Sequence, residues 1–134
     1  MGFGVWDLMY YVTLWIVLGW PDSLSTWDIL FLIPVPWVAP VWAPVLVAIL
    51  FIVIGSYLFL TEQRERIYGW IDSGMILAAA VIVVASFLVE SGAAVEHRVP
   101  TSFPVWLYAA GVALGAGWVI RVERAAPKRS RRMS

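Results

Sequence analysis

The stretch FLIPVPWVAPVWAPVLV, residues 31–47, decides how this chain folds, because it combines a strongly apolar composition with several prolines. The prolines stand at positions 34, 36, 40 and 44. A proline removes a backbone donor and breaks or kinks the interior of a helix. The stretch is therefore predicted to be the edge of a membrane span together with the loop that precedes it.

The two later prolines are compatible with the beginning of a helix. The first four backbone N–H groups of a helix have no partner within it, so Pro40 and Pro44 cost little there. Residues 45–60 then run uninterrupted within a span at 41–60, whereas Pro34 and Pro36 keep the residues before them from joining it.

A short apolar segment precedes these prolines. The sequence STWD at 25–28 has the form of a helix capping box, which predicts a helix over residues 26–33. At 1.5 Å per residue this helix is only about 12 Å long and cannot span a bilayer. We expect a short apolar outer-face hairpin or interfacial helix between the first two spans. Trp27, Phe31 and Trp37 either close the top of the helices or form a docking surface for a partner subunit.

The composition excludes an ordinary water-soluble domain. The chain has 134 residues, of which 62% are hydrophobic and 13% charged, and its mean hydropathy is +0.85. Soluble domains are nearer half apolar and a quarter charged. We therefore expect a single domain embedded in the lipid bilayer. The absence of cysteine excludes disulfide exchange, thiolate catalysis and Cys-ligated metals.

Four segments approach the length of about 20 apolar residues that a helix needs to cross the hydrocarbon core. They are residues 3–20, 41–60, 69–89 and 103–120. The predicted fold is all-α, a polytopic bundle of four transmembrane helices. The first segment is short and carries Asp7, so a three-span alternative, with this segment on the outer surface, stays open.

The basic residues indicate the orientation of the bundle, because cytoplasmic loops are enriched in Lys and Arg. If both termini are cytoplasmic, eight of the nine basic residues lie inside and Arg98 alone lies outside. The outer loops carry Asp22, Asp28, Glu90 and Glu96 instead. We expect a multi-pass protein of the cell (inner) membrane with both termini in the cytoplasm.

The tail at residues 121–134 is strongly basic. Each Lys or Arg near an anionic leaflet contributes about 1 kcal/mol to membrane binding. We expect this tail to bind anionic lipid and not nucleic acid, because no accompanying nucleic-acid-binding domain is present. The residues expected to contact lipid are Arg121, Arg124, Lys128, Arg129, Arg131 and Arg132.

Small residues predict a contact between the third and fourth spans. Gly111 and Gly115 form a GxxxG pair, and Gly74 and Ala78 fall on one face of the third span. Small residues four positions apart let two helix backbones approach closely, and packing drives association in lipid. We expect these spans to pack together, with contact to a partner protein as the alternative.

Two carboxylates form the candidate ion or proton site. Asp7 and Asp72 lie near the inner ends of the first and third spans. Neither reaches the bilayer midplane, where transporters usually bind their substrate and coupling ion. Both lie near helix N-termini, where the helix dipole favours a negative charge. If the two face each other inside the bundle, they would share a proton or a cation.

The sequence contains no combination of residues typical of an enzyme or a cofactor site. His97 is the only histidine, and a zinc or haem site needs further ligands. The leading hypothesis is a small integral membrane protein, an accessory, assembly or scaffolding subunit that acts through helix–helix contacts with a membrane-protein partner or as a homo-oligomer. The alternative is a small oligomeric transporter or channel that uses Asp7 and Asp72.

Overall fold

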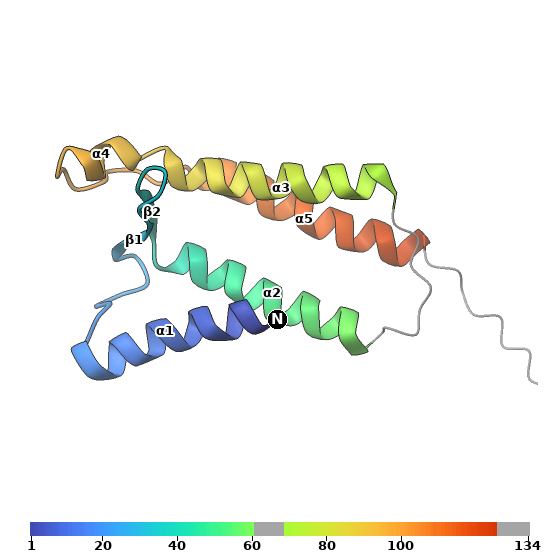
Figure 1. Cartoon of the computed structure of the whole chain (residues 1–134), viewed down its shortest axis with the longest axis horizontal. Helices are drawn as coiled ribbons and strands as arrows, with labels where there is room; N and C mark the ends of the chain where they lie inside the picture. The colour runs from blue at the N-terminus through green and yellow to red at the C-terminus, as the bar shows by residue number, and fades with distance from the viewer. Residues whose placement is uncertain (61–68, 126–134) are drawn as a thin grey trace, which may run out of the picture.

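The computed structural model describes residues 1–60 and 69–125, which form five helices and one two-stranded hairpin. The four longer helices run roughly along the long axis of the molecule (Figure 1). In chain order the elements are α1 (Gly2–Leu18), β1 (Trp27–Phe31), β2 (Trp37–Pro40), α2 (Trp42–Leu60), α3 (Trp70–Leu88), α4 (Ser91–Val95) and α5 (Val105–Ala125).

Three helical segments of the described chain are long and apolar enough to cross a membrane. They are Trp42–Leu60, Trp70–Val95 and Val105–Ala125, which correspond to the second, third and fourth predicted spans. Helix α1 is also apolar but has only 17 residues. At 1.5 Å per residue it is about 25 Å long, slightly less than the hydrocarbon core. The span at residues 3–20 therefore remains a prediction.

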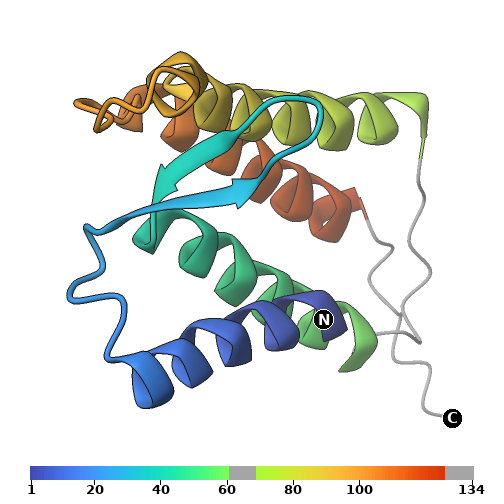
Figure 2. The ribbon, with the colours of Figure 1, turned by 60° about the vertical axis from the view of Figure 1, so that its left-hand side comes forward.

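The long helices form two pairs. Helices α3 and α5 pack along each other, and α1 packs on α2 (Figures 1 and 2). Glycine permits the close approach in both pairs. A Cβ built on Gly111 would stand 2.8 Å from Val83 Cγ2, and one on Gly4 would stand 2.5 Å from the Ala48 carbonyl oxygen. Small residues thus let the backbones in each pair come close together, as expected of helices in lipid.

The segment between α1 and α2 is a β-hairpin, so the helix predicted over residues 26–33 is wrong. Strands β1 and β2 pair antiparallel, with Trp27 opposite Pro40 and Ile29 opposite Val38. Aromatic and β-branched residues such as Trp27, Ile29 and Phe31 favour strands, and pairing with β2 stabilises this one. The predicted capping box does not form, because Asp28 lies in β1 and its carboxylate accepts hydrogen bonds from the Tyr11 hydroxyl and the Ile29 N–H.

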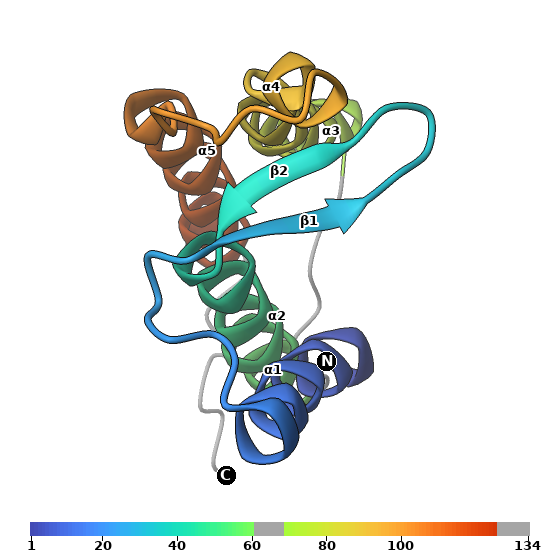
Figure 3. The same ribbon diagram turned by 90° about the vertical axis from the view of Figure 1, so that its left-hand side faces the viewer.

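The hairpin lies across one end of the bundle. Viewed along the long axis, both strands run crosswise to the helices (Figure 3). Strand β2 contacts α2, α3 and α4, and Val38, Ala39 and Pro40 are buried there. Helix α2 follows almost at once, and Pro44 is its third residue, where a missing N–H is tolerated.

The core sits where the hairpin meets the helices. Its buried members are Ala39 of β2, Ala43 of α2, Phe87 of α3 and Tyr108 of α5. The rings of Trp42 and Phe103 pack beside them. The centroid of the Trp42 ring lies 5.3 Å from that of Tyr108, and the centroid of the Phe103 ring lies 5.6 Å from it. This aromatic cluster joins the two helix pairs at the hairpin end of the molecule.

Candidate functional site

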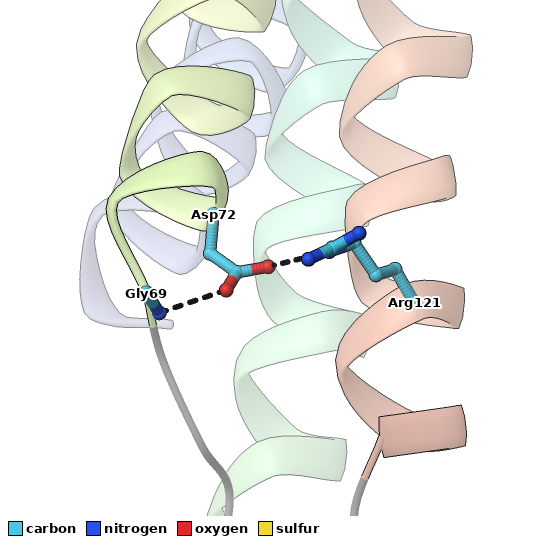
Figure 4. A network of polar contacts seen from close by, with 3 residues as sticks. All are labelled: Gly69, Asp72 and Arg121. Carbon is cyan, nitrogen blue, oxygen red and sulfur yellow. Dashed lines mark hydrogen bonds and ion pairs between the residues drawn. The ribbon is translucent and has the colours of Figure 1, made fainter.

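Asp72 is a buried carboxylate with a hydrogen-bond partner on each of its two oxygens. It lies in the first turn of α3, where Oδ2 accepts the backbone N–H of Gly69 at 2.8 Å. Oδ1 accepts a hydrogen bond from the Nε–H of Arg121 on α5 at 3.1 Å, and Figure 4 shows both contacts. The Asp72 side chain is 7% exposed and that of Arg121 is 50% exposed. Asp72 therefore caps α3 and ties its first turn to α5.

The sequence predicts the helix-end role of Asp72 but not its partner. The basic tail predicts only a lipid contact for Arg121, whereas the structure directs its Nε–H to Asp72 and leaves half of its side chain exposed. The sequence offers one clue to this partnership, which is position. Asp72 and Arg121 both lie at the span ends next to the basic loops. Charged groups inside a membrane bundle commonly pair with one another.

Asp7 lies on the other helix pair. It is half-buried on α1, and within residues 1–60 and 69–125 it makes no hydrogen bond or ion pair. The two carboxylates of the predicted ion site thus have different surroundings, since Asp72 binds Gly69 and Arg121. In the part of the chain that the structure describes, no contact joins Asp7 to Asp72.

A second polar contact, which the sequence does not indicate, links α1 to the hairpin. The Tyr11 hydroxyl donates to Oδ2 of Asp28 on β1 at 2.8 Å, and Tyr11 is buried. Tyr11 follows Asp7 by four residues, so the two lie on one face of α1. Asp28 is the second residue of β1, so this bond joins α1 to the hairpin.

Two further hydrogen bonds cross between the helix pairs. The Tyr108 hydroxyl of α5 donates to the Ala43 carbonyl oxygen of α2 at 2.7 Å, and this bond is buried. The Tyr57 hydroxyl of α2 donates to Glu123 of α5 at 3.0 Å. Helices α2 and α5 are therefore joined near both ends by tyrosine hydrogen bonds.

The residues predicted to pack α3 on α5 fall into two groups. Gly111 lies against Val83 and Ile82, and Gly115 lies near Ala79. Gly74, in contrast, faces open space, since a Cβ added there would meet no atom within 4 Å, and Ala78 is only half-buried. The buried face of α3 consists of Asp72, Ala79, Ser86 and Phe87. Seven-residue spacing places Asp72, Ala79 and Ser86 in line, on the side where Asp72 meets Arg121.

The residues proposed for partner docking all lie on the hairpin. The Trp27 ring meets Phe103 edge-on at 6.4 Å, and Phe31 meets Trp37 edge-on at 5.1 Å. Phe31 is 53% exposed, whereas Trp37 is half-buried against the core. Among the described residues, the Trp37 indole N–H is buried without an acceptor. Trp27 and Trp37 thus face into the molecule, and Phe31 begins an exposed tip.

Two of the predicted lipid-binding cations, Arg121 and Arg124, lie on α5. Arg124 is exposed in the last turn of α5. Lys128, Arg129, Arg131 and Arg132 lie outside the described residues, as do Arg64 and Arg66. Within the described ranges, no three His, Asp or Glu side chains come together in a way that would hold a metal ion.

No protein-family model, curated protein or solved structure matches this chain. The Asp72–Arg121 contact connects α3 to α5, and the Tyr11–Asp28 contact connects α1 to the hairpin. The side chains of these four residues are therefore already engaged within the fold. Within the described ranges, the features left for function are the carboxylate of Asp7 and the large exposed apolar surfaces.

Proposed function

We propose that this protein spans the cell inner membrane four times and acts as an accessory or assembly subunit that binds another membrane helix. The observation that carries the proposal is the outward face of α1. This face is aromatic and exposed, and it includes Trp6 and Tyr10. Its opposite face, with Gly4 and Tyr11 buried, is the one that packs on α2 and the hairpin.

The outward face of α1 has features that suit a helix better than lipid. Trp6 and Tyr10 stack with their ring centroids 6.0 Å apart. A shallow hollow beside them is lined by Trp6, Met9, Tyr10, Thr13 and Leu14. The hydroxyls of Tyr10 and Thr13 lie near the middle of α1, where hydrocarbon offers them no hydrogen-bond partner. A partner helix supplies both a surface for the hollow and acceptors for these hydroxyls.

The placement of α1 supports a fourth span. Helix α1 runs antiparallel to α2 (Figure 1), and Met1, which caps α1, lies beside Gly55 in the second half of α2. A helix lying flat on the outer surface would cross α2 and not follow it. In this arrangement α1 begins beside the second half of α2, and α2 is followed in the sequence by Arg64 and Arg66. The positive-inside tendency then places the N-terminus in the cytoplasm.

In-membrane photocrosslinking tests the contact function. A photoreactive amino acid is introduced at Tyr10, and the matched control is Val81, an exposed position on α3. We expect a discrete protein–protein product from position 10 and none from position 81. Two differently tagged copies show whether the partner is the same chain. Crosslinking of position 10 to lipid alone would contradict the proposal.

A hydroxyl substitution sharpens this test. Thr13→Val keeps the shape of the side chain but removes its hydrogen bond to a partner helix, so we expect a lower crosslinking yield from position 10. Thr101→Val makes the same change in the exposed loop before α5 and serves as the control. Equal yields in the two variants would show that Thr13 takes no part in the contact.

A transporter or channel is the second candidate, and the state of Asp7 favours it. A half-buried carboxylate within a membrane span is a candidate ion or proton site. In proteoliposomes, Asp7→Asn should abolish a proton- or cation-dependent flux while the protein still inserts. Asp72→Asn should impair folding more than flux, because Asp72 already binds Arg121. Absence of any flux in the unmodified protein would remove this candidate.

A further inference from the structure

The tip of the hairpin, residues 31–36, is an exposed and wholly apolar loop. Its sequence is FLIPVP, and it contains no charged or hydroxyl-bearing side chain. Leu32 and Ile33 are 68% and 84% exposed, and Phe31 and Val35 are also exposed. Such a run of consecutive exposed apolar residues is unfavourable in water, and it marks an interaction site.

The backbone of this tip is also suited to an apolar environment. Pro34 and Pro36 have no N–H, so two of the six residues present no backbone donor that would need a partner. Unpaired backbone donors are what exclude irregular loops from lipid. The prolines therefore lower the cost of placing this turn at the edge of the hydrocarbon.

The direction of the hairpin brings the tip to the side of the bundle. The hairpin lies level with the first turn of α2 and the last turn of α3 (Figure 1). Viewed along the long axis, its loop reaches sideways past α3 (Figure 3). Because α2 and α3 are long enough to span a membrane, their ends at this level mark the outer boundary of the hydrocarbon core.

We infer that residues 31–36 insert into the outer leaflet and anchor the hairpin laterally in lipid. The inference rests on the proposed membrane placement and adds a lipid-binding element to it. The occupant is lipid, because the apolar tip continues the apolar surface of the spans at the same level. Interfacial elements of this kind bury their apolar side chains about 5–10 Å below the headgroups.

Fluorescence quenching in proteoliposomes tests this inference, and the absence of cysteine in the chain makes the labelling specific. Three single-cysteine variants each carry an environment-sensitive fluorophore. Ile33→Cys reports on the tip, Ser102→Cys on an exposed outer loop, and Val81→Cys on the exposed face of α3. Ile33 is so exposed that its replacement removes little internal packing. The quenchers are aqueous iodide and phosphatidylcholine with a nitroxide on its acyl chain.

The expected pattern separates the three positions. Iodide should quench position 33 several-fold less than position 102, and the spin-labelled lipid should quench position 33 strongly. A nitroxide attached to the acyl chain near the headgroup should quench position 33 more strongly than a nitroxide deep in the bilayer, because the tip lies at the interface. A nitroxide deep in the bilayer should quench position 81 more strongly.

Other outcomes would overturn the inference. Iodide quenching of position 33 equal to that of position 102 would place the tip in water. Protection of position 33 from both quenchers would show that protein covers it. If position 81 is also inaccessible to the lipid quencher, the proposed membrane placement itself fails and the lipid anchor fails with it.

Discussion

Single residues set the distance between the helices of each pair. At Gly111 the backbone of α5 passes so close to Val83 that a Cβ would stand 3.0 Å from the Val83 backbone nitrogen. At Gly74 on α3 the corresponding space is open. Both glycines lie within helices, so they share the same cost in helix propensity and differ in their surroundings.

This difference gives a matched pair of substitutions. Gly111→Ala should destabilise the protein by about 1–3 kcal/mol, because the added methyl group forces α3 and α5 apart. Gly74→Ala should be neutral or stabilising by up to about 1 kcal/mol, because it adds only helix propensity. Reversible unfolding in mixed micelles measures both changes. Equal stabilities of the two variants would contradict the close approach at Gly111.

Arg121 and Arg124 form a second matched pair on α5. Arg121→Gln should lower the unfolding midpoint in detergent, because it leaves the carboxylate of Asp72 without its cation. Arg124→Gln removes the same charge one turn later, at an exposed position, and should have a smaller effect. A larger effect of Arg124→Gln would show that net charge, and not the contact with Asp72, matters for stability.

These residues could be predicted from the sequence only in part. A position near a helix N-terminus makes Asp72 recognisable as a helix-end charge. Its partnership with Arg121, 49 residues away, depends on how far each helix is rotated. Helix α3 is apolar on nearly all sides, so its sequence gives little contrast from which to read that rotation. For the same reason the small-residue pattern predicts that Gly74 packs on α5. In the structure Gly74 faces open space, and Ala79 makes the contact with α5 instead.

At the scale of elements, a tyrosine hydrogen bond connects the two helix pairs. Tyr108→Phe keeps the ring in the aromatic cluster but leaves the Ala43 carbonyl oxygen without this donor. We expect a loss of about 1 kcal/mol of stability. Tyr10→Phe removes a hydroxyl from the exposed face of α1 and should leave the stability of the isolated protein unchanged. The same unfolding measurement compares the two variants.

The spans were predictable as elements, whereas for the segment before α2 the sequence left a hairpin and an interfacial helix open. Length and hydropathy were sufficient for α2, α3 and α5, because a lipid environment demands long apolar helices. The run ILFLI, residues 29–33, has no polar–apolar alternation, so periodicity does not separate a strand from a short helix. The apparent capping box favoured the helix, and the pairing with residues 37–40 that stabilises the strand is not visible in so short a segment.

At the scale of the whole molecule, the distribution of basic residues predicts which end faces the cytoplasm. Gly2→Cys reports on the start of α1, and Ser102→Cys reports on the loop between α4 and α5 at the hairpin end. An impermeant maleimide added to intact cells should label position 102 and reach position 2 only after permeabilisation. Labelling of position 2 from outside would instead support a first segment on the outer surface or the reverse orientation.

The pairing of the helices could not be predicted with the same ease as their number or orientation. Charge counting compares loops and carries no information on which helices touch. The pairing of α1 with α2 depends on the fit of Gly4 against Ala48, and the link between the pairs depends on Tyr108 and Ala43. Such fits are local and steric, so they become visible only in three dimensions.

The aromatic cluster at the hairpin end provides an intrinsic optical signal. Trp27, Trp42, Phe87, Phe103 and Tyr108 come from the hairpin, α2, α3, the loop before α5, and α5. The Trp42 and Tyr108 rings are perpendicular at 5.3 Å, a fixed chiral arrangement that gives near-ultraviolet circular dichroism. Separation of any one of these elements would weaken this band, so assembly of the bundle can be followed by light in unlabelled protein.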